Sequence, residues 1–191
     1  MRYEYWIERG TLIIKGKFFG ISTGLLGGWK KVKYAFNHSI REDRVNEVLK
    51  DPIKYLRNVA KGFGLRNYFG LLTSVPMDKL CIKRFEDVEV FVTAGVLNPN
   101  ERIGTINIIA VLDCRVPRSA LLNAIITVTE AKSKTLIENG YNFTGTNTDA
   151  VIVLSTCKGK YYRYSGPASD LGKKIWKVVC EAVECSLKKW I

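Results

Sequence analysis

The six residues 144–149, T-G-T-N-T-D, place hydroxyl groups, backbone N–H groups and one carboxylate directly before an apolar strand. A turn of this composition aims several donors at one point, and Asp149 stands at the mouth of the strand as an acceptor or a general base. The same composition is typical of an Asx-type turn with a purely structural role. Composition alone therefore leaves a functional and a structural interpretation open.

A second set of candidate residues lies on the segment 117–139, which is predicted to be a helix because Pro117 suits a first helical turn and Gly140 follows the end. At about 100° per residue, one arc of this helix carries the apolar side chains of Leu121, Ile125, Val128 and Leu136. The nearly opposite arc carries the polar side chains of Asn123, Thr127, Glu130 and Lys134.

Lys132 is the exception on this helix, because it projects within the apolar arc, with Thr129 just beside it. An ammonium group in such a place is costly unless it is paired or faces a cavity. An enclosed lysine of this kind suits a catalytic base or an anion anchor. Two alternatives stay open: the helix rolls about its axis, or Lys132 extends its charged end to water.

A third cluster spans the end of one predicted strand, T-A-G at 93–95, and the start of the next, G-T-I-N at 104–107. Its polar side chains include Thr93 and Asn107. Asn107 stands in the otherwise apolar run I-N-I-I-A-V-L, where its amide must find hydrogen-bond partners. A buried amide with a structural role is the alternative to a substrate contact.

The elements that position these clusters form a mixed pattern of strands and helices. Apolar segments bounded by turn residues predict strands at 68–73, 88–94, 103–112 and 150–154, and shorter strands at 3–7, 12–14, 18–22 and near 32–36. Helices are also predicted from Pro52 to Gly62 and from Pro167 through Leu187. This pattern predicts a mixed α/β (α+β) fold in one compact domain over 1–191, with a mostly central sheet, helices packed on it, an N-terminal β-rich meander and a C-terminal helix.

The charge distribution argues against a nucleic-acid partner, although the 191 residues carry a formal net charge of +12. Residues 1–75 hold 14 basic and 6 acidic side chains, residues 76–157 hold 8 and 9, and residues 158–191 hold 8 and 3. Basic charge therefore lies on the flanks, where it is typical of a solvated surface. The middle of the chain, which holds the three clusters, is nearly neutral.

Several site types are excluded by composition. The single histidine, His38, excludes sites with several imidazoles and requires any Ser-His or Cys-His dyad to use His38 itself. The glycine-rich segment G-L-L-G-G-W-K-K lacks the G-K-[ST] ending of a phosphate-binding loop. No protein metal site is expected.

Five cysteines, an odd number without a C-x-x-C pair, indicate reduced and mostly buried thiols rather than a zinc ribbon or a disulfide framework. No leader sequence or membrane-spanning apolar run is recognisable, so we expect a cytoplasmic protein without a membrane partner. Glutamine is absent while charged residues are plentiful, which is typical of proteins from very hot habitats, although eleven asparagines do not follow that trend.

The three clusters, in this order, resemble the adenosylcobinamide amidohydrolase (CbiZ) family. The matching segments are V-T-A-G-V-L-N at 92–98, G-T-I-N at 104–107, A-L-L-N-A-I-I-T-V-T-E-A-K at 120–132 and T-G-T-N-T-D-A-V-I-V at 144–153. Weaker matches are G-L-L-T-S-V at 70–75 and Y-S-G-P-A-S-D-L-G at 164–172. The segment S-T-G-L-L-G-G at 22–28 is similar to the family's S-S-A-x-x-N-G-G but lacks its alanine and asparagine.

The resemblance implies hydrolysis of the amide that joins aminopropanol to the corrin ring of adenosylcobinamide, a step of corrinoid salvage and cobalamin biosynthesis that releases adenosylcobyric acid. The cobalt arrives within the substrate, and no further cofactor is implied. Amide hydrolysis needs a base, a proton for the departing amine and stabilisation of an oxyanion. Our hypothesis assigns Asp149 or Glu130 as the base and Lys132 as oxyanion stabiliser or proton donor. The expected substrate-binding residues are Ser22, Thr93, Asn107, Thr129, Thr146 and Thr148.

Several alternatives remain open at this stage. Ser22 or Thr105 could act as a hydroxyl nucleophile through an acyl-enzyme. A wide cleft for the corrin ring is expected to be lined by aromatic residues such as Phe18, Phe19, Trp29, Tyr34 or Phe36, which core packing explains equally well. The competing functions are a non-catalytic module that binds corrinoids or small ligands, and a basic nucleic-acid-binding protein. The sequence does not specify the oligomeric state.

Overall fold

The computed structural model describes residues 2–95 and 104–190. Within these ranges the chain forms an eight-stranded sheet in the order β4-β3-β2-β8-β7-β6-β5, with β1 paired to β2 outside that path. Neighbouring strands are antiparallel except for the parallel pairs β3–β4 and β7–β8. The strands are β1 (Tyr3–Glu8), β2 (Thr11–Ser22), β3 (Gly28–Ser39), β4 (Tyr68–Thr73), β5 (Cys81–Phe85), β6 (Val88–Gly95), β7 (Thr105–Leu112) and β8 (Ala150–Ser155). The helices are α1 (Val45–Lys50), α2 (Pro52–Gly62), α3 (Arg118–Glu138) and α4 (Asp170–Lys188), with 3-10 turns at Glu42–Arg44 and Met77–Lys79.

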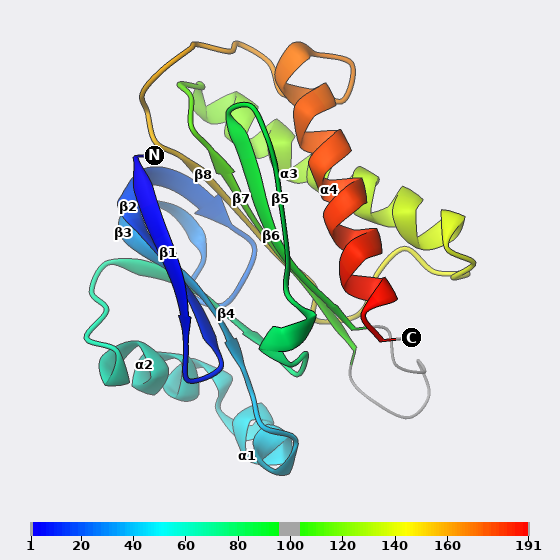
Figure 1. Ribbon diagram of the computed structural model, residues 1–191. Coiled ribbons are helices and arrows are strands. Elements are labelled where there is room, and N and C mark those ends of the chain that lie inside the picture. Colours follow the sequence, from blue (N-terminus) through cyan, green and yellow to red (C-terminus); the bar gives the residue numbers. More distant parts are fainter. Residues whose placement is uncertain (1, 96–103, 191) are drawn as a thin grey trace.

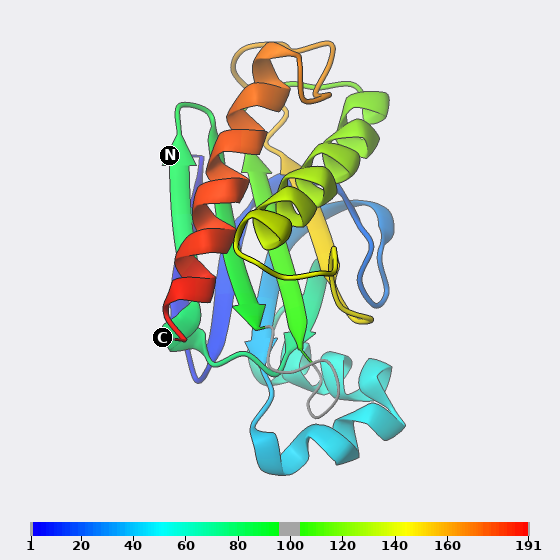
Figure 2. The ribbon, with the colours of Figure 1, turned by 90° about the vertical axis from the view of Figure 1, so that its right-hand side faces the viewer.

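The sheet is covered on both faces (Figure 1). Helices α3 and α4 lie side by side on one face (Figure 2) and enclose the largest apolar core with β6, β7 and β8. Strand β1 crosses the other face, where the Tyr5 ring packs edge-on against Phe91 of β6 with 4.9 Å between ring centres. All residues of β6, β7 and β8 are consequently buried. The predicted mixed α/β class is confirmed.

Strand β2 is one bent strand rather than the two short strands, 12–14 and 18–22, that the sequence predicts. Its register against β3 shifts between Lys15 and Phe18, as in a β-bulge. A Cβ atom on Gly16 would lie 2.5 Å from the Phe18 ring and 3.0 Å from Tyr3 Cβ, so the bend requires glycine. Because the first half of β2 pairs with β1 and the second half with β8, the bend brings β1 over the sheet.

The helix boundaries follow their capping residues. The Asp51 side chain accepts a hydrogen bond from Lys54 N at 3.0 Å, which begins α2 at the predicted residue. The C-terminal helix begins three residues later than predicted from Pro167, because the Ser169 hydroxyl accepts a hydrogen bond from Gly172 N at 3.1 Å.

Strand β5 and helix α1 were not predicted. Among the described residues, no helix is long and apolar enough to cross a membrane.

The prediction that the cysteines are reduced thiols is wrong for two of them. Cys81 at the start of β5 and Cys185 near the end of α4 form a disulfide that links positions 104 residues apart. The spacing of cysteines along the chain gives no hint of this pair, since only the packing of α4 against β5 and β6 brings the two together. Cys114, Cys157 and Cys180 are free.

Candidate active site

Lys132 of α3 and Asp149, the residue before β8, form a largely buried ion pair. The Lys132 side chain is 8% exposed, and its Nζ lies 2.5 Å from Asp149 Oδ2. Lys132 lies on the buried side of the helix, as predicted, and the alternative that it extends its charged end to water is excluded. The buried face is rotated from the predicted arc, since it includes Thr127 and leaves Ile125 only partly buried. Pairing is what allows an ammonium group to be buried at this position.

The Asp149 carboxylate accepts hydrogen bonds from three groups besides Lys132. Its Oδ1 accepts from Ile106 N at 2.8 Å and from the Thr146 hydroxyl at 2.6 Å, and its Oδ2 accepts from Thr146 N at 3.1 Å. The carboxylate therefore ties the turn 144–149 both to α3 and to the first residues of β7. Four donors therefore converge on this one carboxylate.

Gly145 allows the turn to pass directly over this ion pair. A Cβ atom at Gly145 would lie 2.4 Å from Lys132 Nζ and 2.5 Å from Asp149 Oδ2, closer than any side chain can approach. The T-G-T sequence thus has a steric reason: the flanking threonines supply hydroxyls, and the glycine leaves room for the two charged groups.

A pair of threonine hydroxyls joins the same turn to the start of β7. Thr105 Oγ1 and Thr148 Oγ1 lie 2.8 Å apart, and the Thr148 hydroxyl also donates to the Gly104 carbonyl at 3.3 Å. Thr105 is buried and Thr148 is exposed. The G-T-I-N and T-G-T-N-T-D segments, separate in the sequence, consequently form one continuous hydrogen-bonded surface.

The buried side-chain amides of Asn107 and Asn37 form a hydrogen-bonded chain that reaches Thr93. Asn107 Nδ2 donates to Asn37 Oδ1 and to the Leu72 carbonyl, both at 2.9 Å, and Asn37 Nδ2 donates to Thr93 Oγ1 at 2.9 Å. These contacts confirm that the Asn107 amide finds partners. Its Oδ1, however, is buried and has no hydrogen-bond partner among the described residues. The three side chains connect β3, β6 and β7.

Asn37 was missed by the sequence analysis. It lies on β3 two residues after Ala35, and both are buried, so the alternation of the strand points an amide into the core. A polar residue at an inward position of a strand is the signal that could have identified it. Its partners Thr93 and Asn107 are 56 and 70 residues away in sequence, and no local pattern specifies them.

Ser22 lies at the last position of β2, next to the start of β8. Its hydroxyl oxygen accepts a hydrogen bond from Gly24 N at 3.1 Å, and no acceptor for its proton lies among the described residues. The following residue, Thr23, exchanges hydrogen bonds with Val151 at 3.0 and 2.9 Å. The hairpin 23–27 is thereby fixed beside the strand that Asp149 precedes.

The end of α4 and the residues just after it also support this region. Ser186 Oγ accepts from Ala94 N at 2.8 Å, and Trp190 Nε1 donates to the Ala94 carbonyl at 2.7 Å. Both backbone groups of the residue after Thr93 are thus held by the last turns of the C-terminal helix. The disulfide at Cys185 anchors that helix to β5 one residue from Ser186.

Several predicted residues lie elsewhere. Glu130 and Thr129 are exposed on the outward side of α3, and the Thr129 hydroxyl donates to the Ile125 carbonyl of its own helix at 2.8 Å. The expectation that Glu130 joins Lys132 at the site fails geometrically, because two residues along a helix point in directions about 200° apart. Thr127, predicted on the polar arc, is buried and donates to the Ser165 carbonyl at 2.8 Å.

The predicted aromatic wall is only partly present. Phe18 and Phe36 are buried in the core and Tyr34 is half-buried, so core packing explains the first two. Phe19 and Trp29 stack with ring centres 5.8 Å apart, and Trp29 is 41% exposed. Within the described ranges, no three His, Cys, Asp or Glu side chains gather as metal ligands would.

A family model and two named relatives indicate one family. A family model described as adenosylcobinamide amidohydrolase (CbiZ) matches residues 14–191. An adenosylcobinamide amidohydrolase of Methanosarcina mazei is 42% identical over 198 residues, covering 97% of this chain and 98% of that protein. One of Halobacterium salinarum is 30% identical over 184 residues, covering 87% and 79%. The crystal structure of the PH0078 protein from Pyrococcus horikoshii OT3 gives a TM-score of 0.48 at 11% identity, covering 97% and 78%.

Proposed function

This chain belongs to the adenosylcobinamide amidohydrolase family, and we propose from that premise that it hydrolyses the amide linking aminopropanol to the corrin ring of adenosylcobinamide. In this reaction the carbonyl carbon gains a bond to oxygen, the C–N bond breaks, and the nitrogen leaves with a proton as the free amine of aminopropanol. The acid product is adenosylcobyric acid. The cobalt belongs to the substrate, and residues 1–191 act as one catalytic domain.

The convergence of the family's segments on one end of the sheet is the observation that carries this proposal. The turn 144–149, the start of β7, the end of β6, the hairpin 23–27 and Lys132 of α3 are linked there by direct hydrogen bonds or backbone contacts. A charged pair, several hydroxyls and backbone N–H groups occupy this end. These are the group types that amide hydrolysis requires when no imidazole is present.

We assign Lys132 to stabilise the charge that develops on the amide carbonyl oxygen or on the departing nitrogen during hydrolysis. Its ammonium stabilises the oxyanion or protonates the departing amine, and Asp149 holds it in place together with the turn. Thr146 and Thr148 position the substrate from the turn, while Thr93 and Asn107 support it from the sheet. Glu130 takes no part in this assignment, because it is exposed on the outward side of α3.

The attacking oxygen comes either from water or from a side-chain hydroxyl. The hydroxyl candidates are Ser22 and Thr105; Ser22 accepts a hydrogen bond from Gly24 N, and Thr105 is hydrogen-bonded to Thr148. On either hydroxyl route the proton of the attacking group must pass to the departing amine. Attack by Ser22 would form an ester with the corrin carboxyl group and release aminopropanol before water cleaves the ester. Intact mass of the protein during turnover distinguishes these routes, since only the ester route adds the corrinoid mass.

The stacked pair of Phe19 and Trp29 is the aromatic surface we assign to the corrin ring. Trp29 lies directly after the hairpin that follows Ser22, and its cross-strand partner is Ile21, the residue before Ser22. A large, partly apolar ring system gains contact area from such an exposed aromatic face. Phe18 and Phe36 are not available for this role because both are buried.

We place the reaction in the cytoplasm of an organism from a hot habitat. The absence of glutamine supports the second part of this proposal. The Cys81–Cys185 disulfide is compatible with both parts, because intracellular proteins of hyperthermophiles are often rich in disulfides, unlike those of mesophiles.

The experiment that tests the function is incubation of the purified protein with adenosylcobinamide, followed by mass spectrometry of the corrinoid and detection of free aminopropanol. We expect stoichiometric formation of the acid and the amine. Corrinoid binding without release of aminopropanol would instead identify a binding module. Retention on DNA with a steep dependence on salt, without turnover, would identify a nucleic-acid-binding protein.

A further inference from the structure

A basic pocket of about 810 Å³ opens at the end of the sheet opposite the Asp149 site. One of its lining residues, Thr156, follows β8, whereas Asp149 precedes that strand. Seven residues of extended chain separate the two, a distance of about 23 Å. The pocket is thus separate from the proposed active site, and nothing in the amide hydrolysis uses it.

Positive charge dominates the lining of this pocket. Five cationic side chains surround it, against one carboxylate, that of Glu4. The cations come from the residue before β1, from the bulged part of β2, from β3 and from the segment after β8, and they are Arg2, Lys15, Lys17, Lys33 and Lys158. Segments far apart in sequence therefore bring charges of one sign to a single concavity.

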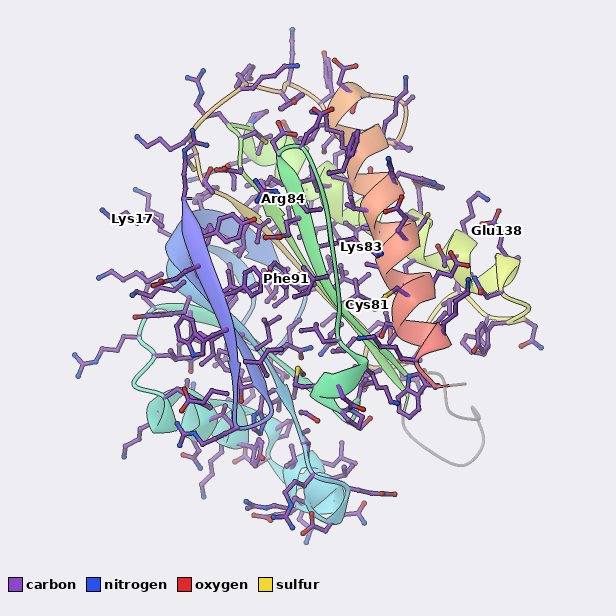
Figure 3. The ribbon with its side chains drawn as sticks, in the orientation of Figure 1. Lys17, Cys81, Lys83, Arg84, Phe91 and Glu138 are labelled. Atoms are coloured by element: carbon purple, nitrogen blue, oxygen red, sulfur yellow. A yellow bond between two sulfur atoms is a disulfide. The ribbon has the colours of Figure 1, made fainter. Side chains whose placement is uncertain are left out.

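Three of these cations are not neutralised by the protein. Arg2 pairs with Asp113 at 2.8 Å, and Lys15 pairs with Glu4 at 2.8 Å. In the described part of the chain, Lys17, Lys33 and Lys158 form no ion pair. Like charges gathered in this way repel one another, and a bound anion would relieve the repulsion. Lys17 extends outward from the sheet, where it is free to approach a ligand (Figure 3).

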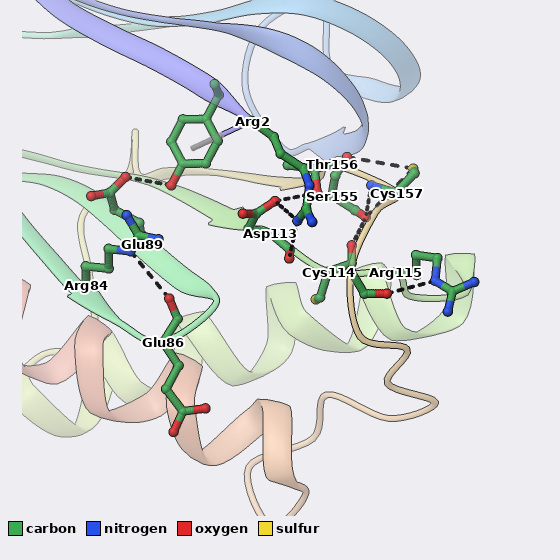
Figure 4. A network of polar contacts seen from close by, with 12 residues as sticks. Arg2, Arg84, Glu86, Glu89, Asp113, Cys114, Arg115, Ser155, Thr156 and Cys157 are labelled. Atoms are coloured by element: carbon green, nitrogen blue, oxygen red, sulfur yellow. Dashed lines mark hydrogen bonds and ion pairs between the residues drawn. The ribbon is translucent and has the colours of Figure 1, made fainter.

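The lining of the pocket includes two tyrosines, Tyr3 and Tyr34, and one glycine, Gly16. The Phe18 ring and Tyr3 fill the space where a side chain at Gly16 would lie, and the Tyr3 hydroxyl donates to Glu89 at 2.6 Å. At the rim, Arg2 and the Thr156 hydroxyl both donate to Asp113 Oδ1 at 2.8 Å (Figure 4). A pre-formed concavity of this kind loses little conformational entropy on binding.

We propose that this pocket binds a small molecule carrying several phosphate groups. Its volume lies in the range of small-molecule sites, about 300–1,000 Å³, and suits a ligand of nucleotide size. Lysine ammonium groups are phosphate ligands that act as point charges, and three unpaired ones match an oligophosphate chain. The half-buried ring of Tyr34 provides contact for an apolar or planar part of the ligand. This inference is independent of the proposed amide hydrolysis.

Isothermal titration of the full-length protein with sodium tripolyphosphate, at constant ionic strength, tests the proposal. The pocket variant is Lys17→Glu/Lys33→Glu. The matched control is Lys54→Glu/Lys61→Glu, which changes the net charge equally at exposed positions of α2. Both variants are checked for parental unfolding behaviour and for parental adenosylcobinamide turnover, which neither is expected to alter.

We expect saturable one-to-one binding by the parent and the control, and affinity at least about tenfold weaker in the pocket variant. Absence of saturable binding by the parent overturns the proposal. Equal weakening in both variants also overturns it, because the effect would then arise from net charge alone. Binding of a single-stranded DNA oligonucleotide without any binding of tripolyphosphate would likewise overturn it in favour of a polymer surface.

Discussion

The backbone N–H of Ile106 donates a hydrogen bond of 2.8 Å to Asp149 Oδ1, which joins the start of β7 to the turn before β8. The other oxygen of the same carboxylate pairs with Lys132 of α3. One side chain thus links three segments that are distant in sequence. The loss of its charge should affect both the stability of the fold and the chemistry at this end of the sheet.

Asp149→Asn is expected to lower the free energy of unfolding by about 3–5 kcal/mol, because it leaves the buried Lys132 ammonium without its counter-charge. Chemical denaturation of the variant and the parent measures the difference. The double variant Lys132→Met/Asp149→Asn should recover much of the lost stability, since the unpaired charge is removed. If the double variant is as unstable as Asp149→Asn, the cost does not arise from the ion pair.

Gly145→Ala is expected to reduce turnover of adenosylcobinamide by at least about tenfold, since a displacement near the chemistry of 1 Å can cost more. The added Cβ would lie 2.4 Å from Lys132 Nζ and must displace either the turn or the ion pair. Gly62→Ala is the matched control, because its Cβ would meet nothing within 4 Å. Parental activity in Gly145→Ala would show that the turn can move without consequence.

Reduction of the Cys81–Cys185 disulfide is expected to destabilise the protein by about 2–4 kcal/mol, because the bond closes a long loop in the unfolded chain. Thermal unfolding with and without a thiol reductant measures this. Under denaturing conditions, thiol titration should find the three free cysteines Cys114, Cys157 and Cys180 before reduction. Cys180→Ser serves as a control that leaves the disulfide intact. Five reactive thiols in the unreduced protein would contradict the assignment.

His38 is expected to titrate below its ordinary value of about 6.5, because burial lowers the pKa of its imidazole. The folded state then holds the proton less strongly than the unfolded state. The contribution of His38 to stability is therefore complete above about pH 6.5 and decreases as the pH falls toward the folded pKa. As the sequence has one histidine, its proton NMR signal can be followed without ambiguity. A midpoint at or above 6.5 would be inconsistent with the half-buried position of the ring.

The helices and central strands could be predicted because their signals are local. Apolar composition identified β6, β7 and β8, and Pro52 and Pro117 marked the helix starts. The bend in β2 was missed because Gly16 between two lysines resembles a turn in sequence, whereas the glycine is required by contacts with Phe18 and Tyr3. Edge strand β5 was missed because Lys83 and Arg84 interrupt its apolar pattern.

Part of the candidate site could be predicted because its signal, like that of the helices and central strands, is local in the sequence. Lys132 was identified from one helix alone, because a charge on an apolar arc demands a partner. Asn37 and the disulfide depend on contacts between elements far apart in sequence, and no local pattern encodes them. Glu130 was included because it lies beside Lys132 in a contiguous motif, yet the geometry of a helix directs neighbours to different faces.

The rate of adenosylcobyric acid formation in Lys132→Met and Glu130→Gln, measured by mass spectrometry beside the parent, tests the central claim most directly. The substitutions lie two residues apart on the same helix and differ in that only Lys132 pairs with Asp149. We predict at least about a hundredfold loss of turnover for Lys132→Met, consistent with the loss of a group that stabilises charge, and parental turnover for Glu130→Gln. Parental turnover in Lys132→Met would contradict the account.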